Sequence, residues 1–374
     1  MNYRGFNKDG ARVSLLGYGA MRFPTDDSGE IDRAQAKKLI DIAYASGVNY
    51  YDTAYMYHDG KSELFLADAL ADYPRDSYFL ADKMPMWMAD TADDIDRIFD
   101  DQLAKCKTDY FDFYLVHAVD EKVISRFDEL GAYDKLIARK KAGEIKRLGF
   151  SFHDSVEVLE SFLDKYEWDF VQLQLNYLDW TYQRAKEQYE AVTSRGIQVI
   201  VMEPVRGGSL VNLTQQANEL LRAAHPDRTI PAWAMRFAAS REGVLCVLSG
   251  MSDDAALYDN IASLSDPRLF TAEDEAVAFK AAELLLSAKT VPCTACGYCS
   301  ACPQNIAIPR LFRMYNDASV SGNAGSFKQS YNSLPTEQQP TNCIDCGLCR
   351  DRCPQHIDVP ARLRDIDRLA KGDI

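Results

Sequence analysis

The residues best suited to chemistry are the cysteines, because eight of the ten lie in two short runs. Disulfide frameworks are typical of small secreted chains, whereas crowded thiols in a long chain favour metal ligation. A tetrahedral zinc site usually draws paired cysteines from two separated segments, but each run here has three evenly spaced cysteines and a Cys-Pro pair. The spacing therefore favours iron–sulfur ligation, with zinc as the alternative. The runs read Cys293-x2-Cys296-x2-Cys299-x2-Cys302-Pro303 and Cys343-x2-Cys346-x2-Cys349-x3-Cys353-Pro354.

Both runs resemble the bacterial ferredoxin pattern. In that pattern three thiolates bind one cubane, and the fourth, which precedes a proline, binds the other. The first run is one residue shorter than the pattern before its last cysteine. The resemblance implies two [4Fe–4S] clusters with crossed ligation, one held by Cys293, Cys296, Cys299 and Cys353 and the other by Cys343, Cys346, Cys349 and Cys302.

A second set of residues has the types needed for carbonyl reduction. Reduction by a nicotinamide hydride needs a proton donor beside the carbonyl oxygen, and a tyrosine can serve if a nearby cation lowers its pKa. A carboxylate would then hold that cation. Asp52, Tyr57, Lys83 and His117 each lie at or just after the end of an expected strand. Side chains at the C-terminal ends of barrel strands converge on one pocket, so we expect these four to meet there.

The elements that would position these residues alternate along the chain. From about residue 13 to residue 265, short apolar runs alternate with amphipathic stretches, as parallel βα units require. Eight strands with helical crossovers predict an α/β fold, a closed (β/α)8 TIM barrel. One of the crossovers is expected to be a single helix over Ile124–Ala142. The expected strands are Ser14–Gly17, Val48–Asp52, Tyr78–Asp82, Phe111–Val116, Ile145–Phe150, Phe170–Leu173, Gln198–Val201 and Val244–Leu248.

The composition changes after the last expected barrel helix, Ala272–Ser287, to Cys, Pro, Asn, Ser and Gly. We therefore predict a barrel domain over residues 1–289 and a small ferredoxin-like domain with two clusters over residues 290–374. A chain of 374 residues is long enough for a barrel of roughly 250 residues and such a module.

Charge and hydropathy exclude several classes of partner. The formal net charge is −14, which disfavours binding to nucleic acid or to an anionic membrane surface. No apolar run approaches the roughly 20 residues of a membrane span, and the first residues lack the apolar core of a secretory signal. We expect a cytoplasmic protein.

The segment Asp52-Thr53-Ala54-Tyr55-Met56-Tyr57 is followed by Lys83 and His117 after the next two strands. This order resembles the DTAxxY, Lys and His motifs of the aldo-keto reductase family, and the resemblance covers roughly residues 13–265. It implies that Tyr57 is the general acid, that Lys83 and Asp52 tune it, and that His117 orients the carbonyl. It also implies a small carbonyl or alcohol substrate.

The same resemblance implies a nicotinamide cofactor. Phe152 stands where the family usually has Asn, and Met202-Glu203-Pro204 stands where many members have a stacking aromatic residue. Asp253 and Asp254 occupy the region where relatives that bind NADP have basic residues, so we expect NADH to be preferred over NADPH. The expected contacts are Ser151 and Gln172 at the carboxamide, Gly207, Gly208 and Leu210 at the pyrophosphate, and Gly250 and Asn260 toward the adenosine.

Three kinds of function stay open. The first is an aldo-keto reductase whose clusters exchange electrons with a partner protein. The second is a reductase whose clusters are structural or gate the substrate. The third is a non-enzymatic iron–sulfur protein on a barrel scaffold. Two one-electron clusters match one hydride, but splitting a hydride normally needs a flavin, and no flavin motif is recognisable. The complete set of Asp52, Tyr57, Lys83 and His117 argues against the third kind.

Overall fold

The computed structural model describes residues 1–266 and 270–372. The chain divides into two compact units, and each is considered by itself. The barrel unit comprises Met1–Pro204 and Ala234–Phe270, and the C-terminal unit comprises Val205–Trp233 and Thr271–Ile374. Two segments before residue 290 thus cluster with the C-terminal unit, and a domain boundary at residue 290 stays a prediction.

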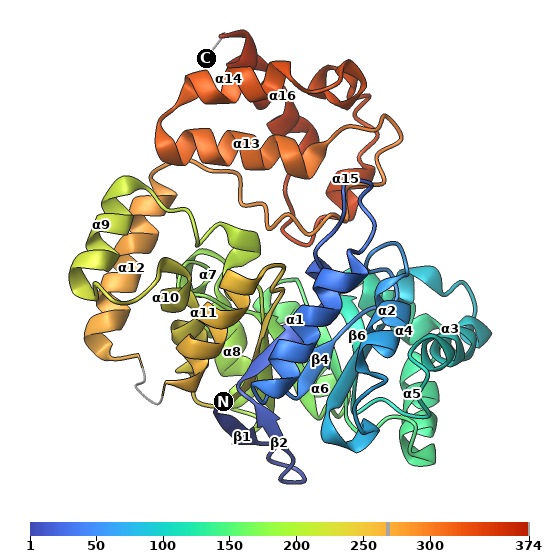
Figure 1. Cartoon of the computed structure of the whole chain (residues 1–374). Coiled ribbons are helices and arrows are strands. Elements are labelled where there is room, and N and C mark those ends of the chain that lie inside the picture. Colours follow the sequence, from blue (N-terminus) through green and yellow to red (C-terminus); the bar gives the residue numbers. More distant parts are fainter. Residues whose placement is uncertain (267–269, 373–374) are drawn as a thin grey trace. The chain divides into compact units, whose positions relative to one another are not determined.

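Eight parallel strands form a closed barrel in the order β10-β3-β4-β5-β6-β7-β8-β9 (Figure 1). The predicted (β/α)8 fold is therefore confirmed. Closure pairs every strand on both sides, which leaves no sheet edge open. The strands are β3 (Leu16–Gly19), β4 (Tyr50–Asp52), β5 (Phe79–Met84), β6 (Phe113–Val119), β7 (Leu148–Phe152), β8 (Phe170–Gln174), β9 (Gln198–Met202) and β10 (Val244–Ser249).

Helices follow the strands, and polar caps mark where several of them begin. Asp32, Asp120, Ser155 and Asp253 each accept a hydrogen bond from an amide in the first turn, as N-caps do. The helices are α1 (Arg33–Ala45), α2 (Ser62–Leu70), α3 (Ala92–Lys105), α4 (Glu121–Glu129), α5 (Ala132–Ala142), α6 (Val156–Lys165), α7 (Asp179–Tyr182), α8 (Ala185–Thr193), α10 (Ile230–Ala239) and α11 (Asp254–Ser265), with short 3-10 turns at Ala20–Arg22, Arg75–Ser77, Met86–Met88 and Arg206–Gly208.

Several predicted elements are wrong in detail. Strands β6 and β7 begin later than expected, because Phe111 and Ile145 form only an isolated bridge before them. The segment Ile124–Ala142 is not one helix, because Gly131 has a φ of +60° and separates α4 from α5. The first barrel strand begins two residues later than expected. Ser14 belongs to an antiparallel hairpin outside the barrel, formed by β1 (Tyr3–Gly5) and β2 (Arg12–Ser14).

The C-terminal unit is helical, and its described residues include no β-strand. In sequence order it has α9 (Gln215–Ala224), α12 (Ala272–Leu286), α13 (Ile308–Ser321), α14 (Ala324–Asn332), two 3-10 turns (Thr336–Gln338 and Pro340–Asn342), α15 (Leu348–Asp351) and α16 (Val359–Lys371). Helix α13 packs against α14 and α16. Their shared apolar core includes Leu311, Phe312, Phe327, Leu363 and Ile366.

Neither unit offers a membrane-crossing element: among the described residues, every helix is too short or too polar to span a bilayer.

We predict that Gly149→Ala destabilises the barrel. Gly149 in β7 pairs with Phe170 in β8, and a Cβ at residue 149 would lie 2.4 Å from the Phe170 carbonyl oxygen. Backbone must move to admit it, at a cost of about 1–3 kcal/mol or more. The midpoint of urea unfolding, followed by circular dichroism, should fall. Gly5→Ala is the matched control, because a Cβ there meets no atom within 4 Å; equal midpoints for the two variants would contradict the prediction.

Candidate functional site

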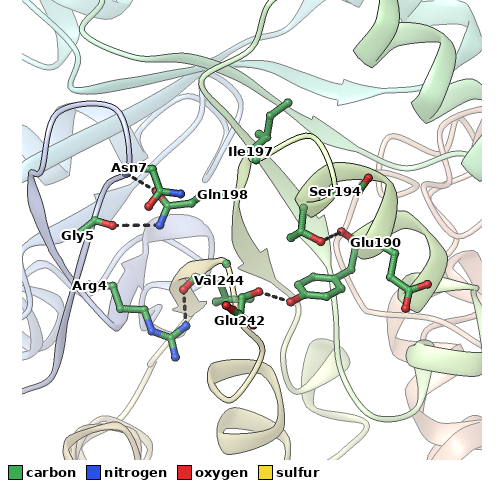
Figure 2. Close-up of a pocket in the computed structure, with 13 residues that line it drawn as sticks. Arg4, Gly5, Asn7, Glu190, Ser194, Ile197, Gln198, Glu242 and Val244 are labelled. Atoms are coloured by element: carbon green, nitrogen blue, oxygen red, sulfur yellow. Dashed lines mark hydrogen bonds between the residues drawn. The ribbon is translucent and has the colours of Figure 1, made fainter.

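One cavity of about 800 Å³ lies at the N-terminal end of the barrel, beside β9 and β10 (Figure 2). Its polar groups are largely engaged with protein partners. The Arg4 guanidinium donates to the carbonyls of Ala239 and Val244, and Gln198 bridges the backbone of Gly5 and Asn7. None of the predicted site residues lines this cavity. Active sites of (β/α)8 enzymes lie at the opposite, C-terminal ends of the strands.

A buried ion pair lies at that opposite end. Asp52 ends β4, Lys83 lies near the end of β5, and the Lys83 Nζ is 2.5 Å from Asp52 Oδ1. Lys83 also donates to the Thr53 carbonyl at 2.6 Å, and its side chain is fully buried. Burial raises the pKa of Asp52, and Lys83 opposes this effect. The structure therefore brings together the two residues expected to form a pair.

Tyr57 and His117 lie next to this pair. The Lys83 Nζ is 4.9 Å from the centre of the Tyr57 ring, and the Tyr57 and His117 rings are 6.0 Å apart, edge to face. Among the described residues no protein group is hydrogen-bonded to the Tyr57 hydroxyl, so this group is available to a ligand. All four predicted catalytic residues thus meet at one end of the barrel.

The electrostatics differ from the expectation for Tyr57. Burial raises the pKa of Tyr57 well above its usual range, and Asp52, Glu203 and Asp82 raise it further. Arg22 acts in the opposite direction. The phenol is therefore protonated at neutral pH, which is the form a general acid needs.

His117 is held in its neutral form. Burial lowers the pKa of His117 well below its usual range, and the positive charge of Lys83 lowers it further. Trp87 packs on the imidazole, with 5.1 Å between ring centres, and 42% of its surface is exposed. Trp87 was not anticipated from the sequence, although its position four residues after Lys83, in the loop that follows β5, could have indicated it.

Ser151 and Gln172 lie on the next two strands of the barrel, β7 and β8. The Ser151 hydroxyl accepts a hydrogen bond from the Ala118 amide at 2.8 Å. The Gln172 amide nitrogen contacts the Met202 sulfur at 3.6 Å, while its carbonyl oxygen is buried without a hydrogen-bond partner among the described residues. An amide donor such as a carboxamide would satisfy that oxygen.

A charged pair lies at the ends of β3 and β9. Arg22 is 3.4 Å from Glu203, and its side chain also packs against Gly250. Neither Arg22 nor the pairing of Glu203 was anticipated. Asn260 is buried and donates to the Ser249 hydroxyl at 2.9 Å, directly beside Gly250.

Gly207, Gly208 and Leu210 lie in the C-terminal unit, in a tight turn. The amides of Gly208 and Leu210 donate to the Val205 carbonyl, and the next helix begins only at Gln215. A Cβ on residue 207 would lie 1.9 Å from the carbonyl oxygen of Thr294, so glycine permits this turn to pack against the segment entering the first cysteine run. These amides are engaged in the turn, and pyrophosphate binding by this segment stays a prediction.

The two cysteine runs have the same backbone conformation. In each run the residue before the second cysteine, the glycine after it and the third residue beyond the last cysteine all have positive φ. A helix then begins six residues after that last cysteine, at Ile308 in one run and at Val359 in the other. The extra residue of the second run therefore lies between Cys349 and Cys353 and does not change the backbone pattern after Cys353. The matching positions are Ala295 and Asp345, Gly297 and Gly347, and Asn305 and His356.

The thiols form two groups across the runs. The pKa of Cys299 is raised by burial and by the neighbouring thiols of Cys296, Cys293 and Cys353. The pKa of Cys349 is raised by burial and by Cys343 and Cys302. Cys302 also shares one recess with Cys343, Cys346 and Cys349. The thiols therefore lie in two groups of four, as crossed ligation of two [4Fe–4S] clusters would require, and the ligation itself stays a prediction.

The chain matches two family models. Residues 15–277 match the Aldo/keto reductase family, and residues 292–357 match the 4Fe-4S dicluster domain. Among curated proteins, the uncharacterized oxidoreductase YqkF of Bacillus subtilis (strain 168) is 24% identical over 300 residues, covering 71% of this chain and 92% of that protein.

Solved structures agree with this assignment. The holo form of the aldo-keto reductase AKR11C1 from Bacillus halodurans is 25% identical with a TM-score of 0.60, covering 75% of this chain and 96% of that one. The thermostable aldo-keto reductase Tm1743, in complex with the inhibitor epalrestat, shares the fold at 20% identity and a TM-score of 0.62, covering 75% of this chain and 100% of that one. The family model spans most of the chain and the strand-end residues meet as the family motif requires, so this protein belongs to the aldo-keto reductase family and carries a 4Fe-4S dicluster domain.

Proposed function

We propose that this oxidoreductase transfers a hydride between a nicotinamide cofactor and a small carbonyl or alcohol substrate, with Tyr57 as the general acid. The observation that carries the proposal is the buried Lys83–Asp52 pair at 2.5 Å, with Tyr57 and His117 beside it. A fully buried lysine is costly unless its charge has a role or a partner, and such sites are often functional.

The proposed reduction assigns one task to each side chain. The neutral His117 orients the carbonyl by hydrogen bonding, and the protonated Tyr57 hydroxyl donates its proton to the carbonyl oxygen. Lys83, held by Asp52, lies 4.9 Å from the centre of the Tyr57 ring and positions the phenol. The exposed face of Trp87 beside His117 suits a planar or apolar substrate.

A nicotinamide would supply the hydride when bound. The unpaired Gln172 carbonyl oxygen and the neighbouring Ser151 suit its carboxamide, and Gly250 and Asn260 are proposed to face the adenosine end. Lys38 is paired with Asp254 at 2.6 Å and Arg22 with Glu203 at 3.4 Å, which supports a preference for NADH over a cofactor with an additional phosphate.

The clusters are proposed to exchange single electrons with a partner protein. Cys346 is exposed, and the apolar side chains of Ile344 and Leu348 on either side of it are 61% and 44% exposed. Such an apolar margin beside a ligand is typical of a contact surface. A structural role is the second candidate, favoured by the packing of six of the eight cysteines against the apolar core of α13, α14 and α16.

We predict that Tyr57→Phe lowers kcat for carbonyl reduction by about 10²–10⁴-fold, because it removes the proton donor and little volume. Cofactor binding and iron content should be unchanged. Tyr177→Phe is the matched control, since that hydroxyl is buried without a hydrogen-bond partner among the described residues. A panel of aldehydes, ketones and quinones supplies the substrate; a Tyr57→Phe enzyme that turns over at the wild-type rate would show that the acid is elsewhere.

We predict that NADH binds more tightly than NADPH in anaerobic equilibrium titration. Asp254→Ala releases Lys38 and should raise the affinity for NADPH relative to NADH by up to about fivefold, the range of an exposed ion pair. Asp41→Ala is the control, because it breaks a similar pair with Lys37 on the same helix. Tighter binding of NADPH by the wild type contradicts the prediction.

We predict that anaerobically purified protein contains about eight iron atoms per chain, as two cubanes require. Crossed ligation makes double variants diagnostic. Cys293→Ala with Cys353→Ala removes two ligands of one cluster and should leave about four irons, whereas Cys293→Ala with Cys302→Ala should remove both clusters. The opposite pattern would mean that each run holds its own cluster, and stoichiometric zinc without iron would exclude the clusters.

The same variants distinguish the two roles of the clusters. If the clusters carry electrons, cluster loss should abolish NADH-dependent reduction of a one-electron acceptor and spare carbonyl reduction. Loss of both activities together with the fold of the C-terminal unit would support the structural role instead.

A further inference from the structure

Two buried carboxyl groups lie just outside the barrel wall, behind Lys83. Asp82 directly precedes Lys83 in β5, and alternate residues of a strand point to opposite faces, so its side chain points toward the helices. Glu63 comes from α2 and Cys106 from the end of α3. The ligand atoms of all three residues lie within 4.8 Å of one another, and Glu63 and Asp82 are both 0% exposed.

The two carboxyl groups have different partners. Asp82 accepts hydrogen bonds from the Lys83 amide at 2.8 Å and from the Cys106 thiol at 3.7 Å. Among the described residues, neither oxygen of Glu63 accepts a hydrogen bond, and the Lys105 Nζ lies 3.5 Å from Glu63 Oε2. Two carboxylates this close in a dry space cannot both ionise without a large cost. A proton on one of them would give Glu63 the donor that it lacks.

The positive charges near the two carboxyl groups can balance only one negative charge. Lys105 is shared with Asp101 at 2.8 Å, and the pKa values of Cys106 and Tyr114 are raised well above their usual ranges by burial and by the two carboxyl groups. Burial raises the pKa of both carboxyl groups, and Glu63 raises that of Asp82 further, to well above its usual range. The groups that interact with the pair are Lys83 from β5, Lys105 and Cys106 from α3, Tyr114 from β6, and Tyr55 and Tyr57 from the loop before α2.

We propose that Glu63 and Asp82 share one proton, carried by Asp82, and that the neutral Asp82 is a positioning residue for Lys83. The amide of Lys83 donates to Asp82, and the carbonyl of Lys83 accepts from the Gln102 side chain at 3.0 Å. Gln102 is held in turn by the Tyr114 hydroxyl. The amide and the carbonyl of Lys83 are therefore both bound by side chains on the helix-facing side of β5. A neutral Asp82 also leaves Asp52 as the carboxylate that balances Lys83. The positioning role rests on the proposed function, whereas the shared proton does not.

The shared proton is tested by the pH dependence of unfolding. A carboxyl group whose pKa is raised in the native state stabilises that state at low pH, and this stability is lost as the pH rises toward the native pKa. The unfolding constant of the wild type should therefore rise tenfold per pH unit above the ordinary aspartate range relative to Asp82→Asn, which is about 1.4 kcal/mol per unit. The holoprotein is unfolded in urea under anaerobic conditions and followed by tryptophan fluorescence.

Asp27→Asn, at an exposed position, is the matched control and should run parallel to the wild type. Infrared spectroscopy at neutral pH provides a second measurement. The wild type should show the carbonyl band of a protonated carboxylic acid, and Asp82→Asn should lose it. Parallel unfolding curves for the wild type and Asp82→Asn, or an unchanged infrared band, would overturn the shared proton. One zinc ion per chain that Asp82→Asn removes would also overturn it, in favour of a metal site.

The positioning role is tested by kinetics. Asp82→Ala should lower kcat by about 10- to 100-fold through displacement of Lys83, with a smaller change in KM. Asp82→Asn should restore most of that loss, because an amide keeps the acceptor for the Lys83 amide without a charge. If Asp82→Asn is as impaired as Asp82→Ala, the role of Asp82 depends on a negative charge and the proposal is wrong. Failure of the proposed function would appear separately, as full activity in Tyr57→Phe with the pH dependence of unfolding intact.

Discussion

A lysine ammonium buried completely inside a barrel is the constraint on which the active site depends. Removing such a charge from water is expensive, and the cost is offset only by a close counter-charge with good hydrogen bonding. Lys83 has both, in Asp52 at 2.5 Å and the Thr53 carbonyl at 2.6 Å. Loss of the Asp52 carboxylate would leave the buried ammonium without a counter-charge, so β4 and β5 must keep their register for the site to exist.

The neighbours of this pair take their protonation states from it and from their burial. The charge of Lys83 and a dry environment both keep His117 neutral, while burial and nearby carboxylates keep the Tyr57 phenol protonated. The result is a protonated phenol beside a neutral imidazole, which are the groups that the proposed carbonyl reduction would use. Arg22 and Glu203, which pair at 3.4 Å, act on the pKa of Tyr57 in opposite directions.

The C-terminal unit obeys a different constraint. It has no sheet among its described residues, and six of its eight clustered cysteines lie along the edge of its apolar core. Two copies of one backbone pattern, each with left-handed residues at matching positions, bring the last cysteine of each run to the other run's group. Metal binding would link the two cysteine runs through iron–thiolate bonds and so stabilise the folded C-terminal unit.

The sequence alone was enough for the fold class and for the number of barrel strands. It also suggested the catalytic residues and the crossed cysteine groups, whose roles stay predictions. Strand periodicity and cysteine spacing are local signals, and the convergence of strand ends is a general property of barrels. The sequence was not enough for the break at Gly131, where one left-handed residue separates two helices although the amphipathic pattern continues across it. It was also not enough for the hairpin, which contains Ser14 in place of the first barrel strand.

Only the tertiary structure decided which side chains from different elements are in contact. It brings Trp87 onto His117, Arg22 onto Gly250 and Glu63 onto Asp82, residues far apart in the chain whose charges and burial depend on how the helices pack around the barrel. It also decided that burial is the largest cause of the raised pKa of Tyr57, because desolvation is a property of the folded environment and cannot be read from residue types.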